Sequence, residues 1–140
     1  MSILSQSTIS KKISFSGVGI HTGKTVNLNI LPASPNSGII FKRTDLKHDN
    51  IIIPNFENVV DATLCTTISN QHGVKVSTIE HLMAAFLGLG IDNAVVEVDS
   101  QEIPILDGSA KDFVSALKKT GLKNSDVPIK LIKINNTIVL

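Results

Sequence analysis

The sequence predicts an α+β fold, a two-layer sandwich of one mixed β-sheet with two helices on one face. The chain of 140 residues contains 19 Ile and 12 Val against 13 Leu, and β-branched residues favour strands over a helical bundle. Alternation of apolar and polar residues recurs along the chain, whereas helical periodicity occurs in two places only. The resulting order of many strands, a helix, two strands and a second helix indicates a mixed sheet covered by helices.

Alternating or continuous apolar residues predict the strands. They are expected at residues 7–15, 25–31, 38–43, 51–53, 64–69, 74–77, 94–98 and 102–106. The sequence Asn-Gln-His-Gly at 70–73 separates two of these segments and has the composition of a hairpin loop. Most of the strands therefore precede the first helix.

Two segments have the signals of helix starts and stops. Residues 77–80, Ser-Thr-Ile-Glu, have the spacing of a capping box and predict a helix to about Leu87, followed by glycine stops. Ser109 is expected to cap a second helix, which Gly121 ends. The apolar face of the first helix should pack on the sheet, and it consists of Ile79, Leu82, Met83, Phe86 and Leu87.

The opposite face of the first helix is small and weakly polar instead of rich in Lys and Glu. It consists of His81, Ala84, Ala85 and Gly88. Small residues at this spacing permit close approach of another helix, so this face predicts a second packing partner. Glu80 is explained either by the capping box or by catalysis, and His81 either by an interface or by metal binding. A metalloprotease helix would have a second His at position 85, which is Ala85.

The glycine-rich segment 19–25 is close to a phosphate-binding loop but fails the motif. Val18 stands where the first glycine is required, and a strand follows where the motif needs a helix N-terminus. Nucleoside triphosphate binding is therefore excluded. Two interpretations stay open: a plain strand connection, or a loop whose His21 or backbone approaches a ligand.

Composition excludes further classes. The formal charge of +1 gives no electrostatic case for nucleic acid or an anionic membrane, and a single cysteine cannot form an intrachain disulfide. The N-terminus lacks a signal-peptide pattern, and no stretch approaches the ~20 apolar residues of a spanning helix. We therefore expect a soluble cytoplasmic protein without a transmembrane segment.

The C-terminal part predicts a domain boundary. Residues 1–123 are expected to form one domain, and residues 124–129 are expected to form a linker. Residues 130–140 then begin a fresh alternating strand, which we interpret as the first strand of a second domain.

Six blocks, in order along almost the whole chain, resemble the UDP-3-O-acyl-N-acetylglucosamine deacetylase family. They are GVGIHTGK at 17–24, RTD at 43–45, LCT at 64–66, STIEHL at 77–82, GLGIDN at 88–93 and EIPILDGS at 102–109. Members of this family are zinc amidases that commit Gram-negative bacteria to lipid A synthesis. They have two similar domains packed helix layer to helix layer, and the resemblance covers the N-terminal half only.

The resemblance also implies roles. Glu80 matches the general base, His81 matches the first zinc ligand, and the positions that line the substrate site are Ile20, His21, Leu64 and Cys65. The remaining Zn²⁺ ligands, the general acid and an oxyanion-stabilising Thr belong to the family's second domain. The implied substrate is UDP-3-O-acyl-N-acetylglucosamine, and the isolated chain is expected to be inactive. The alternative is a non-catalytic module that self-associates through the face of helix 77–88.

Overall fold

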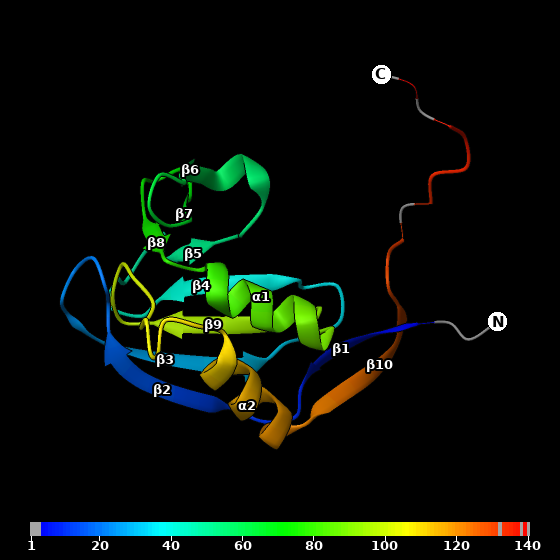
Figure 1. Cartoon of the computed structure of the whole chain (residues 1–140), viewed down its shortest axis with the longest axis horizontal. Helices are drawn as coiled ribbons and strands as arrows, with labels where there is room; N and C mark the ends of the chain where they lie inside the picture. Colours follow the sequence, from blue (N-terminus) through cyan, green and yellow to red (C-terminus); the bar gives the residue numbers. More distant parts are fainter. Residues whose placement is uncertain (1–3, 132, 138, 140) are drawn as a thin grey trace.

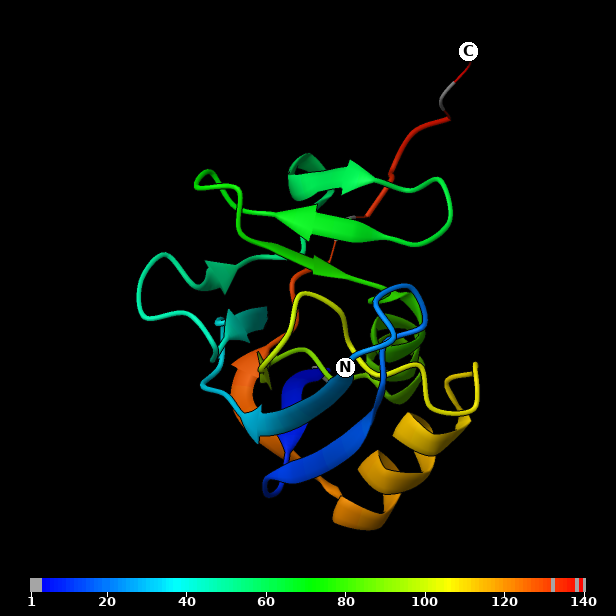
Figure 2. The ribbon, with the colours of Figure 1, turned by 90° about the vertical axis from the view of Figure 1, so that its left-hand side faces the viewer.

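The computed structural model describes residues 4–131, 133–137 and 139, and it has the expected α+β architecture (Figure 1). The main sheet has five strands in the order β2 (Ile13–Val18), β3 (Thr25–Pro32), β9 (Ala94–Val98), β4 (Ile39–Arg43) and β5 (Ile51–Ile52). Only the β4–β9 pairing is parallel, so the sheet is mixed as predicted. Helices α1 (Glu80–Leu89) and α2 (Lys111–Thr120) lie on the same face of it (Figures 1 and 2).

The hydrophobic core lies between this sheet and the helices. Alternate residues of β3 and β9 are fully buried, and the two helices bury one face each. The core side chains of these four elements are Val26, Leu28, Ile30, Ala94, Val96, Val98, Leu82, Ala85, Phe86, Phe113 and Leu117. Period-two burial in the strands thus fixes which face receives the helices.

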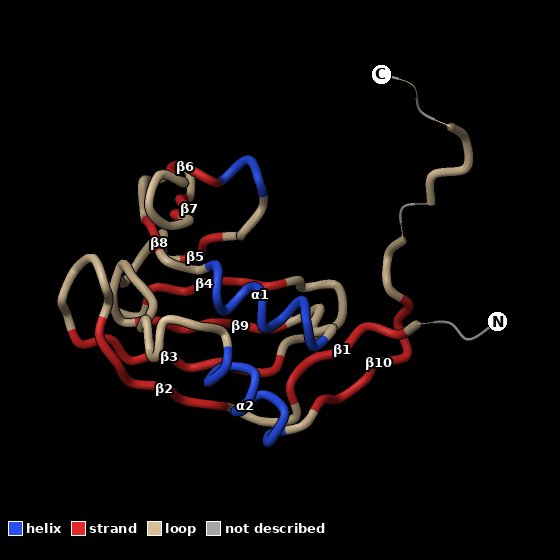
Figure 3. The backbone as a smooth tube through the Cα atoms, in the orientation of Figure 1, coloured by secondary structure: helices blue, strands red, loops and turns tan. Residues whose placement is uncertain are grey.

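Two smaller sheets extend the fold beyond the single sheet that the sequence predicts (Figure 3). One pairs β1 (Ser5–Ile9) with β10 (Leu122–Pro128). The other contains β6 (Val59–Asp61), β7 (Thr67–Ser69) and β8 (Lys75–Ser77), preceded by the 3₁₀ turn η1 (Phe56–Asn58). The β7–β8 hairpin confirms the predicted turn at 70–73, and this sheet stands above the main sheet (Figure 2).

Several expected strands are wrong. The segment 7–15 is not one strand, because an exposed polar stretch at 10–12 separates β1 from β2. The segment 102–106 forms only a single bridge, between Ser77 and Glu102, and Pro104 has no N–H for a ladder. The expected linker 124–129 mostly belongs to β10. Part of the expected strand at 130–140 lies outside the described residues, and the described ones there form no strand.

Helix α1 starts without the expected capping box. Ile79 precedes α1 and no side chain caps it, because Ser77 still belongs to β8. The buried face of α1 includes Ala85, whereas Leu87 is 85% exposed, so both assignments from the helical wheel are wrong. In α2, the Ser109 hydroxyl does accept a hydrogen bond from the Lys111 N–H at 3.1 Å.

No helix among the described residues combines the length and apolar character needed to cross a membrane.

Candidate functional site

A cavity of about 440 Å³ lies where three segments meet: the loop before β3, the segment before β7, and residues 101–102. His21, Leu64 and Cys65, three of the residues expected at the substrate site, line it. Ile20 is adjacent in sequence and 60% exposed, but it is not part of the lining. The fold therefore brings together two blocks that are more than 40 residues apart in the sequence.

Glu80 is the first residue of α1 and is half-buried. Its Oε2 accepts a hydrogen bond from the backbone N–H of Thr66 at 3.0 Å. This bond ties the start of α1 to the segment that carries Leu64 and Cys65. Within the described residues Oε1 has no hydrogen-bond partner, so one oxygen of the carboxylate is held and the other is free to act on a ligand.

His81 follows Glu80 and projects about 100° further around the helix. Its side chain is half-buried. No group of three or more His, Cys, Asp or Glu side chains in the described part of the chain is arranged to hold a metal ion. One imidazole is a suitable zinc ligand but an incomplete set, because catalytic zinc commonly has three protein ligands.

Cys65 is the only cysteine of the chain; it is half-buried and lines the cavity. Its Sγ lies 3.7 Å from the hydroxyl of Thr67. The thiol thus has a neutral hydroxyl as its polar neighbour, and the small side chain forms part of the cavity lining.

Glu102 is a member of the cavity lining that the sequence analysis missed as a site residue. Its side chain is fully buried. Oε1 accepts from the His21 N–H at 3.0 Å and from Thr78 Oγ1 at 3.0 Å, and Oε2 accepts from the Thr22 N–H at 2.9 Å. Burial raises the pKa of Glu102, but these hydrogen bonds outweigh it and hold the pKa below its ordinary value. A Glu inside the apolar run EIPIL was the available signal.

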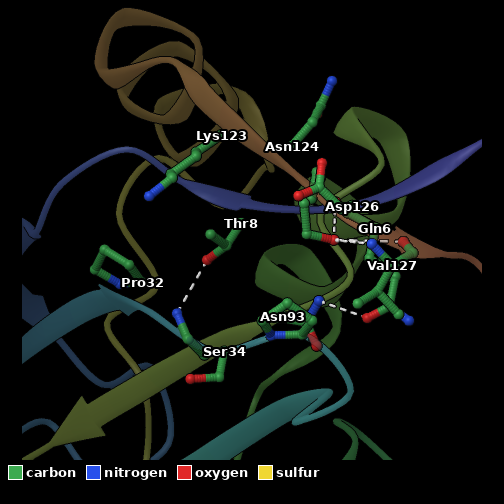
Figure 4. A pocket seen from close by; sticks show the side chains of 13 residues that line it. Gln6, Thr8, Pro32, Ser34, Asn93, Lys123, Asn124, Asp126 and Val127 are labelled. Carbon is green, nitrogen blue, oxygen red and sulfur yellow. Dashed lines mark hydrogen bonds between the residues drawn. The ribbon is translucent and has the colours of Figure 1, made fainter.

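A larger cavity of about 620 Å³ lies at the opposite end of β3, beneath the β1–β10 ribbon (Figure 4). Its buried polar groups bind one another: Gln6 Oε1 accepts from the Asn93 side-chain amide at 3.0 Å, and Thr8 Oγ1 accepts from the Ala33 N–H at 3.0 Å. None of the expected site residues lines it. This cavity is therefore a weaker candidate for the functional site.

The sequence of the whole region matches a known family. The family model described as LpxC: UDP-3-O-acyl N-acetylglycosamine deacetylase matches residues 6–140. The chain belongs to this family. It is 51% identical over 133 residues to the protein of Shewanella denitrificans named UDP-3-O-acyl-N-acetylglucosamine deacetylase. The aligned region covers 95% of this chain and 44% of that protein. Proteins of the same name from Shewanella baltica and Shewanella oneidensis are 49% and 47% identical over the same length.

The chain thus spans less than half the length of the curated relatives that it matches. His21, Leu64 and Cys65 lie around one cavity. The backbone N–H of Thr66, the residue after Cys65, donates a hydrogen bond to Glu80. His81 lies outside the lining of that cavity. The described residues therefore form a cavity that three of the expected site residues line, and Glu80, like His81, lies outside its lining.

Proposed function

We propose that the chain is the N-terminal part of a zinc-dependent amidase that hydrolyses the acetamide of UDP-3-O-acyl-N-acetylglucosamine, in the committed step of lipid A biosynthesis. Family membership and the names of the relatives support this activity. The observation that carries it is the Glu80 carboxylate, held through one oxygen by the N–H of Thr66, whose neighbours Cys65 and Thr67 line the cavity. A carboxylate fixed in this way, with its second oxygen free, is suited to general base catalysis.

In the proposed reaction, water attacks the acetamide carbonyl and the C–N bond breaks, which releases acetate and a free amine. Glu80 takes one proton from the attacking water, and the departing nitrogen receives a proton as the C–N bond breaks, from the general acid that the resemblance places in the second domain. The Thr66 N–H keeps the carboxylate oriented during this transfer. His21, Leu64 and Cys65, which line the cavity, and the adjacent Ile20 would contact the substrate around the reacting amide.

We propose that His81 is one zinc ligand and that the others come from outside the described residues, since these contain no three-residue metal site. A bound zinc ion would supply Lewis acidity, which lowers the pKa of bound water from 15.7 towards ~7. Adjacent positions on a helix diverge by about 100°, so His81 can address a metal while Glu80 addresses water.

The decisive experiment uses a chimaera in which this chain replaces the matching part of the Shewanella denitrificans relative. We expect the chimaera to deacetylate UDP-3-O-acyl-N-acetylglucosamine, and the chain alone to show no turnover. A folded chimaera without activity would contradict the proposed function. Turnover by the chain alone would contradict the division of the site.

A second candidate function, a self-association module, is favoured by one specific observation. Leu87 is 85% exposed on α1, and the neighbouring Ala84 and Gly88 are also exposed. An apolar side chain flanked by small residues allows close approach of another surface. We propose that this face mediates dimerisation of the chain when it is alone, which sedimentation at several concentrations tests.

A further inference from the structure

Glu102 is the only charged residue among the buried side chains of the described chain. Burial of an ionised carboxylate costs free energy of desolvation unless hydrogen bonds or a paired charge offset that cost. No cation of the described residues forms an ion pair with it. Its charge is instead stabilised by two backbone N–H groups and one hydroxyl, which belong to two different segments of the site.

The first segment is the loop 19–24, which wraps around the carboxylate. The His21 and Thr22 N–H groups both point at Glu102, and Gly23 donates its N–H to the Gly19 carbonyl at 2.9 Å. A side-chain Cβ at Gly19 would overlap both Glu102 Oε2 and the Thr22 hydroxyl. The loop therefore closes directly on the carboxylate, and its conformation depends on what occupies position 102.

The second segment is the turn between β8 and α1. Thr78 has a φ of 62°, in the left-handed region that a β-branched residue rarely adopts. Its hydroxyl donates to Glu102 Oε1, and backbone bonds join Ser77 to Gln101 and to Ile103 at 2.9 and 3.2 Å. Thr78 lies two residues before Glu80, so the geometry of this turn determines where α1 begins and where Glu80 and His81 project.

We propose that Glu102 is a positioning residue whose buried carboxylate fastens the His21 loop to the turn that begins α1, and so sets His21 against Glu80 and His81. Glu102 acts through these residues and does not itself carry out the reaction. The proposal deepens the proposed function and rests on it for the identity of the site.

Nuclear magnetic resonance of the chain tests the positioning without any assay of activity. The His21 and Thr22 amide protons, bound to a carboxylate, should resonate downfield and exchange slowly. In E102Q, which replaces an acceptor oxygen by an amide NH₂, both signals should move upfield and exchange about tenfold faster or more. The shifts should spread to the Glu80 and His81 amides. Changes confined to residues 101–103 would overturn the proposal.

Matched variants of Thr78 give an independent test in the chimaera. T78V keeps the shape and removes the hydroxyl donor, whereas T78S keeps the donor. We expect E102Q and T78V to lower kcat about tenfold or more while the protein stays folded and its zinc content changes little, and T78S to restore most of kcat. Equal losses in T78V and T78S, or an unchanged kcat in both E102Q and T78V, would overturn the proposal. An inactive unsubstituted chimaera would contradict the proposed function alone, because the amide signals are measured separately.

Discussion

The carboxylate of Glu80 accepts a hydrogen bond from the Thr66 backbone N–H at 3.0 Å, which joins the first turn of α1 to the segment before β7. The sequence placed this carboxylate in a capping box, where it would have bound the backbone at Ser77. The structure gives it a partner 14 residues away instead, because Ser77 remains in β8. The side chain is thus joined to the segment whose Cys65 and Thr67 line the cavity, and not to its own helix start.

Removal of this carboxylate should abolish activity without unfolding the protein. In the chimaera, Glu80→Ala should lower kcat by about 10²-fold or more, because general base catalysis contributes roughly 10²–10⁴-fold. The loss of a single hydrogen bond to Thr66 should cost only about 1 kcal/mol of unfolding free energy. Steady-state kinetics and urea unfolding measure the two effects.

The matched control for Glu80→Ala is Glu97→Gln on β9, whose carboxylate pairs with Lys42 Nζ at 3.2 Å. Its partner is well exposed, so this variant should change kcat and stability little. Turnover near that of the unsubstituted protein in Glu80→Ala would refute its role as the general base.

Metal binding should depend on His81 and on residues outside the described part of the chain. The chain alone should hold no stoichiometric zinc at micromolar metal, because one imidazole gives weak affinity. The chimaera should hold one zinc ion, and His81→Ala should reduce that content. Equilibrium dialysis with metal analysis measures both, and His72→Ala, on the exposed hairpin loop, is the control. One tightly held zinc ion in the chain alone would contradict the prediction.

Gly19 should tolerate no side chain, for a steric reason. Gly19→Ala would drive a Cβ into Glu102 Oε2 and the Thr22 hydroxyl and should cost about 2 kcal/mol or more. Gly23→Ala is the matched control, since a Cβ there meets nothing within 4 Å and the cost comes only from its φ of 65°, about 1 kcal/mol. Urea unfolding of both variants checks the order. A smaller loss in Gly19→Ala than in Gly23→Ala would show that the loop does not close on Glu102.

Glu102 should make the protein less stable in acid. Burial raises the pKa of this carboxyl, but hydrogen bonds from His21, Thr22 and Thr78 lower it by a larger amount. The folded pKa therefore lies below the ordinary value of 4.5. Its contribution is therefore complete above the unfolded pKa and is lost as the pH falls through the folded pKa.

Urea unfolding between neutral pH and about pH 3 should give a shallower decline in stability for E102Q than for the unsubstituted chain. The comparison is needed because hydrogen bonds from Arg43, Thr63 and Ser109 also lower the pKa values of Asp45, Asp61 and Asp107, respectively. Parallel pH profiles for the two proteins would contradict the prediction.

Periodicity predicted the main sheet because its strands bury alternate residues, as Val26, Leu28 and Ile30 do. It failed where long-range pairing decides the structure. β10 has a polar sequence typical of a linker, yet it pairs with β1 across more than 110 residues. The same limit applies to the proposed site. Motif resemblance suggests Glu80 and His21, but the link through Glu102 depends on hydrogen bonds between three segments that are distant in the sequence, which no local pattern encodes.

The exposed face of α1 should control self-association. Leu87→Glu replaces an apolar side chain that is 85% exposed, so the stability of the monomer should change by no more than about 0.5 kcal/mol. A buried Leu contributes roughly 1.5–3 kcal/mol, and its loss should weaken a dimer about tenfold or more. Phe56→Glu is the matched control, because Phe56 is equally exposed but lies on η1, away from α1. Sedimentation of the two variants over a range of concentrations shows which surface forms the dimer contact. If only Phe56→Glu dissociated the dimer, the contact would lie at η1 and not at α1.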